Sequence, residues 1–124
     1  MIKVLLINLL LINFLFASPK IYNAYALTIS DENGKKEHIQ NKRETDSDFN
    51  GTCFVEIFVN TKYKVEMPKV TIGTAIGHFK SSKSVYKNKI KVGEIMVFKL
   101  YNIRKGYLKI TIYDKLYDMK TFIK

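Results

Sequence analysis

Lysine is the residue whose clustering in this sequence indicates a chemistry, and that chemistry is the attraction of anions. Between residues 62 and 91 the chain contains eight lysines and a single acid, Glu66. The lysines are Lys62, Lys64, Lys69, Lys80, Lys83, Lys87, Lys89 and Lys91. Side chains of this kind on neighbouring strands create a positive field that attracts phosphate-rich or acidic partners. The alternative is a solvated face without a ligand, in a chain that uses lysine heavily throughout.

The partner that this field favours is an acidic phospholipid surface. Each basic residue near an anionic membrane contributes on the order of 1 kcal/mol to binding. An acidic protein or a glycan fits the charge equally well, whereas nucleic acid is not expected for an exported protein. We predict that a basic face binds the lipid through five residues. These are Lys62, Lys64, Lys87, Lys89 and Lys91.

Residues that commonly carry catalysis are few and isolated. His38 and His78 lie 40 residues apart, and Cys53 is the single cysteine, so the chain forms no internal disulfide. A Cys–His pair remains an alternative, but lone residues of these types are more often structural. No spacing of His and Cys suggests zinc. We therefore predict a non-enzymatic protein with no catalytic residues and a buried Cys53, which alternatively pairs with another chain or is a free thiol.

The amino-terminal residues have the pattern of a secretory signal. A lysine at position 3 precedes an apolar run over residues 4–17, and Ala24 and Ala26 supply the small-x-small motif of a cleavage site. We predict that residues 1–26 are a signal peptide and that 27–124 form a single secreted domain, soluble or peripheral at a membrane. An uncleaved anchor is the alternative. Cleavage would remove two lysines and no acid, which leaves a net charge of +8 from the +10 of the whole chain.

The mature part of the sequence has the composition of a β protein. β-Branched and aromatic runs alternate with Gly, Asn and Pro from residue 54 onward, and no window shows a helical stripe. Residues 27–30 are a short apolar start, and the expected short strands cover 54–59, 63–67, 70–72, 95–101, 107–113 and 119–123. Residues 31–49 are expected to form a long loop or ragged hairpin, and 73–84 a soft connection. The pattern predicts an all-β fold, a single antiparallel β-sandwich of about seven strands.

Two of these strands show strict period-two alternation. Met96, Phe98 and Leu100 share one face of 95–101, and Leu108, Ile110 and Ile112 share one face of 107–113. We expect both faces to line the core. Because Arg104-Lys105-Gly106 has the composition of a tight turn, we also expect the two strands to form an antiparallel hairpin.

Two segments of the chain resemble the C2 domain, the calcium- and phospholipid-binding β-sandwich. The segment from Asp48 to Ile57 is similar to the family's first calcium loop, Asp-x-Asn-Gly followed by a strand, but lacks its Asp-Pro pair. The segment from Leu108 to Asp118 is similar to the strand and Asp-x-Asp loop near the family's end, and Glu94 to Leu100 matches another strand. The resemblance covers residues 48–124 and implies a C2-like sandwich.

The resemblance implies a weak calcium site at most. Asp48 and Asp114 match family ligands by position, and Asp118 lies nearby but off register. Leu116 and Thr121 replace two other acidic ligands. Calcium takes six to eight oxygens, several of them charged, so these carboxylates would bind it weakly. We expect no resident cofactor apart from weakly bound calcium. The leading hypothesis is a secreted C2-like module that binds acidic phospholipid, and the alternative is a protein-interaction module that docks a partner by a sheet edge.

Overall fold

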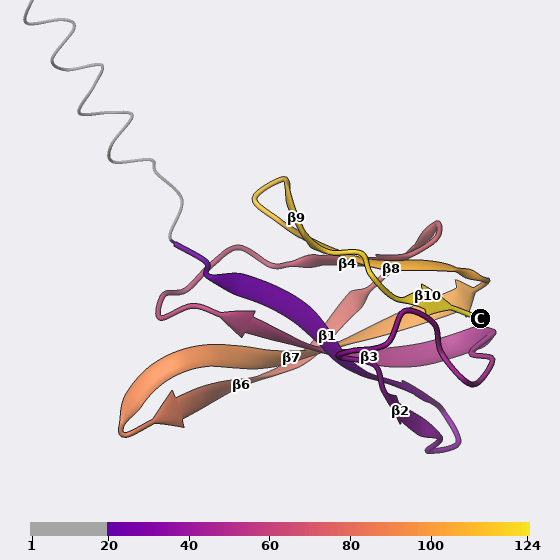
Figure 1. Cartoon of the computed structure of the whole chain (residues 1–124), viewed down its shortest axis with the longest axis horizontal. Coiled ribbons are helices and arrows are strands. Elements are labelled where there is room, and N and C mark those ends of the chain that lie inside the picture. The colour runs from indigo at the N-terminus through magenta and orange to yellow at the C-terminus, as the bar shows by residue number, and fades with distance from the viewer. Residues whose placement is uncertain (1–19) are drawn as a thin grey trace, which may run out of the picture.

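The structure is a computed structural model that describes residues 20–124, and it places these residues in β-strands and connecting loops without a helix (Figure 1). The strands are β1 (Asn23–Asp31), β2 (Lys36–His38), β3 (Gly51–Asn60), β4 (Lys69–Ile72), β5 (Ala75–Ile76), β6 (His78–Lys87), β7 (Ile90–Ile103), β8 (Gly106–Ile112), β9 (Lys115–Asp118) and β10 (Phe122–Ile123). The predicted all-β class is thereby confirmed.

The strands form two antiparallel sheets. The first sheet has the order β2-β1-β3-β7-β6. The second has the order β10-β8-β4-β5, and β9 also pairs with β8. Figure 1 shows the second sheet above the first, with the β6–β7 hairpin extending past it at lower left. The described part of the chain therefore has more strands than the sequence predicted, and β3 and β7 are longer than the segments predicted for them.

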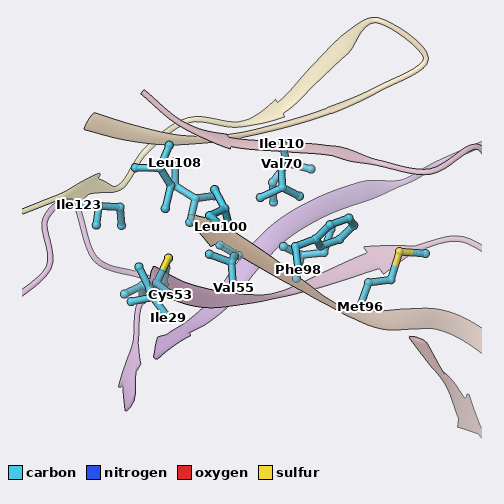
Figure 2. Close-up of a cluster of buried hydrophobic side chains, with 14 of the residues drawn as sticks. Ile29, Cys53, Val55, Val70, Met96, Phe98, Leu100, Leu108, Ile110 and Ile123 are labelled. Atoms are coloured by element: carbon cyan, nitrogen blue, oxygen red, sulfur yellow. The ribbon is translucent and has the colours of Figure 1, made fainter. Parts of the chain in front are cut away.

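The core lies between facing sides of the two sheets (Figure 2). In β3 every second side chain is buried, from Cys53 to Val59, because successive residues of a strand point to opposite faces. Side chains from β7 and β8 meet those of β3 and β4 across this layer. The six residues predicted to face the core are all buried. These are Met96, Phe98, Leu100, Leu108, Ile110 and Ile112.

The predicted hairpin between these two segments is wrong. β7 pairs with β3 along one edge and with β6 along the other, so neither edge is free for β8. β8 instead pairs with β4 in the second sheet. Arg104 and Lys105 therefore carry the chain from one sheet to the other. The alternation correctly predicted which face of each strand is buried, but it carries no information about the strand alongside.

Three further expectations need correction. Residues 61–68 form a loop, so 63–67 is no strand and β3 pairs with β1 and β7 instead. Residues 73–84 are not a soft connection, because they contain β5 and most of β6. The polar segment 31–49 includes β2, which makes a short hairpin with β1.

The first strand bears on the predicted processing site. β1 begins at Asn23, and Ala24 and Ala26 are buried in it opposite Val59 and Ile57 of β3. The predicted boundary after residue 26 therefore falls inside β1. The apolar run of the predicted signal peptide lies outside the described residues. Within residues 20–124 there is no helix long and apolar enough to span a bilayer.

Candidate functional site

The candidate site begins with the tight turn that joins β6 to β7. Asn88 and Lys89 have φ angles of 53° and 66°, and Lys87 pairs with Ile90 across them. Two consecutive residues with positive φ are typical of the type I′ turn, whose twist matches that of the flanking strands. The turn brings Lys87, Lys89 and Lys91 together at one end of the first sheet, with the first two exposed.

The other two predicted lysines reach the same end of the sheet by a different route. β3 ends at Asn60, and its Val59 pairs with Glu94 near the start of β7. The loop 61–68 that follows carries Lys62 and Lys64, both exposed. We call the five lysines Lys62, Lys64, Lys87, Lys89 and Lys91 the basic end.

Hydrogen bonds fix the loop that bears Lys62 and Lys64. The buried hydroxyl of Thr61 donates to the carbonyl of Lys20 at 2.9 Å. At the far end of the loop, the hydroxyl of Tyr113 accepts a hydrogen bond of 2.9 Å from the Glu66 N–H, and the Glu66 carboxylate accepts one from the Tyr113 N–H. The loop is therefore fixed at both of its ends, by Lys20 ahead of β1 and by Tyr113 after β8.

A cavity of about 290 Å³ lies between this loop and the hairpin. Val65 and Met67 of the loop line one side, and Phe79 and Met96 line the other. Charged and polar groups complete the lining: Lys64, Glu66, Ser82, Lys91 and Glu94. Thus Lys64 and Lys91, which are 27 positions apart in sequence, border the same apolar cavity.

Large apolar side chains are exposed around the lysines. Tyr86 and Ile90, which flank the turn, are 63% and 57% exposed, and Tyr63 and Met67 of the loop are similarly open to solvent. These residues are not among the predicted site residues. Tyr86 and Ile90 had a local signal, since each lies two residues from Asn88 in a run of lysines. The cavity had none, because its lining comes from separate segments.

The charges of the basic end are largely uncompensated. Lys91 forms an ion pair of 3.0 Å with Glu94. Among residues 20–124, Lys62, Lys64, Lys87 and Lys89 have no carboxylate within ion-pair distance. Exposed lysines without a partner keep their field available to an anion, although salt screens it.

The structure does not bring the three predicted calcium ligands together. Asp48 precedes Phe49, whose N–H donates to the carbonyl of Lys124, next to the Gly106 end of β8. Asp114 follows the opposite end of β8, which by strand geometry lies about 20 Å away. Asp114 also lines a polar depression with Lys69 and Lys109, so its neighbours repel cations.

Asp118 has a structural partner instead. Its carboxylate is buried and accepts a 2.9 Å hydrogen bond from the N–H of Ala26, beside a β-bulge in β1. It also pairs with Lys120 at 2.9 Å. In the described residues no group of three or more His, Cys, Asp or Glu side chains is arranged to hold a metal ion.

Cys53 is buried in the core as predicted (Figure 2). Burial raises the pKa of its thiol to about 12, because the thiolate would be desolvated there. A nucleophilic cysteine needs the opposite shift and an accessible sulfur. The two histidines lie on exposed positions of β2 and β6, and one strand separates each of these from β3, which carries Cys53.

Comparison of the chain with protein-family models, with curated proteins and with solved structures finds no match.

Proposed function

We propose that this protein is exported and binds acidic phospholipid surfaces peripherally through the basic end. The observation that carries the proposal is the gathering of Lys62, Lys64, Lys87 and Lys89 at one end of the first sheet, without carboxylate partners in the described chain. In this proposal the two sheets form a C2-like sandwich, and no catalytic residue takes part.

The apolar side chains at the basic end support a membrane over a soluble anion. Tyr86 and Ile90 flank the turn and are more than half exposed. Aromatic and apolar residues next to cations suit the boundary between headgroups and acyl chains. There one part of such a side chain contacts the acyl chains and the other part contacts water. Lysines attract the headgroups, while these two side chains enter the interface.

Calcium is at most a weak helper in the proposal. Asp48 and Asp114 lie at opposite ends of β8, and Asp118 is engaged with the N–H of Ala26. Calcium needs several charged oxygens around one point. Binding to acidic lipid is therefore expected to persist in a chelator.

Sedimentation with vesicles tests the proposal. Phosphatidylcholine vesicles with and without phosphatidylserine are mixed with the protein at low and high salt, with calcium or with a chelator. We expect binding that requires phosphatidylserine and weakens with salt. Equal binding to both vesicle types, or none, would refute the proposal.

A matched pair of double variants tests whether the basic end is the surface that binds lipid. Lys87→Glu with Lys89→Glu reverses two charges at the basic end. Lys105→Glu with Lys109→Glu makes the same change on exposed residues at and beyond the β7–β8 connection. Loss of binding in the first variant alone would support the basic end as the lipid-binding surface, whereas equal loss in both would indicate a delocalised charge effect.

A further inference from the structure

The outer edge of β6 is free in the described chain. β6 is the last strand of the first sheet, and within residues 20–124 nine of its ten residues pair with β7 on one side only, with register shifts at Lys80 and between Val85 and Tyr86. Most of its residues are exposed. A strand edge of this kind presents a row of backbone N–H and C=O groups to which another extended chain can add.

β6 supplies part of the lining of the cavity at the basic end. Phe79 and Ser82 of β6 line it together with Met67 and Met96. Ser82 pairs with Met96 and Phe79 with Phe98, so both face the side of the sheet that holds the core. A strand added to β6 would place every second side chain on the same side. One of those side chains would then lie at the mouth of the cavity, and the apolar lining suits a large apolar one.

The positive charge around the edge favours an added strand that is acidic. Between Met67 and Gly93 the chain has no acidic residue and six lysines. Three of the lysines are on β6 itself: Lys80, Lys83 and Lys87. Like charges opposite one another destabilise a strand pair, so a second copy of β6 is disfavoured, whereas carboxylates in these positions are attracted.

We propose that β6 binds an extended acidic segment of a partner protein, which adds a strand to the first sheet and inserts one large apolar side chain into the cavity. This interaction goes beyond the proposed lipid binding, because it uses the backbone along β6 rather than the turn at its end. Backbone hydrogen bonds supply the pairing, and the cavity and the lysines supply the specificity.

The probe for this proposal is a fluorescein-labelled peptide as long as β6, with alternating Thr and Glu and a central Leu in place of one Thr. Two control peptides replace the Leu by Ser or every Glu by Lys. We expect fluorescence anisotropy to show that the Leu peptide binds about tenfold or more tightly than either control. Equal binding of all three peptides would overturn the proposal. A dimer of the protein that the peptide disperses would instead assign the edge to a second copy.

Proline substitutions test the backbone pairing. Successive residues of an antiparallel edge strand direct their N–H groups alternately to the neighbouring strand and to solvent. Of Ser81→Pro and Ser82→Pro, one therefore removes a bond to β7 and lowers Tm, while the other removes an outward donor. One of the two proline variants should have a nearly unchanged Tm. We expect this variant to bind vesicles as the wild type does but no longer to bind the Leu peptide. Undiminished peptide binding by that variant would overturn the proposal.

A charge variant tests the same edge without altering the backbone. Ser82→Glu places a carboxylate at the mouth of the cavity, and Thr74→Glu places one on an exposed turn outside β6. We expect the first change to weaken binding of the Leu peptide about tenfold and the second to leave it within about twofold. Equal effects of both changes would show that the edge is not the binding surface.

Discussion

Asp118 illustrates how one side chain joins the two sheets. β9 belongs to the second sheet and β1 to the first, and the Asp118 carboxylate accepts the Ala26 N–H across the gap between them. The register of β1 against β3 shifts between Ala26 and Thr28, and a bulge of this kind leaves a backbone group outside the ladder. The carboxylate therefore satisfies a donor that would otherwise be buried without a partner.

Removing this acceptor should destabilise the fold. Asp118→Ala leaves the Ala26 N–H without its partner, which costs about 1–3 kcal/mol. Urea denaturation followed by circular dichroism measures the change. The control is Asp48→Ala, since Asp48 is exposed, and it should change the free energy of unfolding by less than about 0.5 kcal/mol. Similar values for the two variants would contradict the structural role of Asp118.

Gly93 permits the close approach of β3 to the start of β7. A Cβ at this position would lie 2.4 Å from the carbonyl oxygen of Val59 and 2.6 Å from the ring of Phe58. Gly93→Ala therefore forces a backbone shift, and overpacking of this kind costs about 1–3 kcal/mol. Gly34→Ser is not a matched control, because Gly34 has a positive φ. Thr74→Ala, on an exposed turn, is a suitable control, and equal denaturation midpoints for both variants would contradict the steric argument.

Cys53 should make stability fall at alkaline pH. Its pKa is about 12 in the folded protein, above its ordinary value, so between about pH 9 and pH 12 only the unfolded thiol loses its proton. The contribution of the Cys53 thiol to the free energy of unfolding is fully present below about pH 9. Above that pH it is lost at about 1.4 kcal/mol per pH unit. Lysines and tyrosines also titrate there, so the measurement compares urea midpoints of the wild type and Cys53→Ala. Parallel pH profiles for the two proteins would show that the thiol contributes nothing.

At the scale of the element, β1 is held along its whole length. Asn23 to Ala26 pair with Ile57 to Asn60 of β3, and the Tyr22 N–H donates to the Asn60 carbonyl at 2.9 Å. The amino-terminal half of β1 thus pairs with the end of β3 that leads into the loop 61–68. The strand and the predicted cleavage motif occupy the same residues.

A chain that starts at Leu27 should accordingly be less stable than one that starts at Lys20. The shorter chain lacks the buried Ala24 and Ala26, and its β3 loses four cross-strand pairs. We expect a lower Tm and faster hydrogen exchange in Val59 and Asn60. Intact-mass analysis of exported protein decides where the natural amino terminus lies. Equal Tm values would show that the first half of β1 adds nothing to stability.

At the scale of the molecule, periodicity predicted the buried faces but not the arrangement of the strands. Alternation in 95–101 and 107–113 identified six core side chains, because the face of a strand on which a side chain lies is determined locally. Strand pairing is not determined locally, so the sequence of the two segments carried no signal that β7 and β8 belong to different sheets. β6 was missed because its serines and lysines show no apolar alternation, and among residues 20–124 only β7 pairs with it.

The candidate site was predictable to the same extent. Lys87, Lys89 and Lys91 lie together because one tight turn joins them, and this follows from their closeness in sequence. Asp48 and Asp114 depend on the topology, which places them at opposite ends of β8. The cavity was unpredictable, because a loop and two strands of distant sequence supply its lining.

The whole molecule carries a net charge of +10, so its attraction to a membrane has an overall component and a local component at the basic end. Lysines without partners attract a membrane over roughly one Debye length, which shrinks from about 10 Å at 0.1 M salt to about 3 Å at 1 M. Vesicle binding should therefore weaken strongly over this range. Because each lysine near the surface contributes on the order of 1 kcal/mol, Lys87→Glu with Lys89→Glu should lower the affinity about tenfold or more at 0.1 M salt.

The same double variant should retain the Tm of the wild type, since neither lysine forms an ion pair in the described structure and exposed charges contribute little to stability. The control with Lys105→Glu and Lys109→Glu has an identical net charge but an intact basic end. If both variants lose affinity equally, net charge alone explains the attraction. If vesicle binding is insensitive both to salt and to the substitutions, it would have to depend on the apolar side chains around the turn. Salt screening cannot weaken a contact that is not Coulombic.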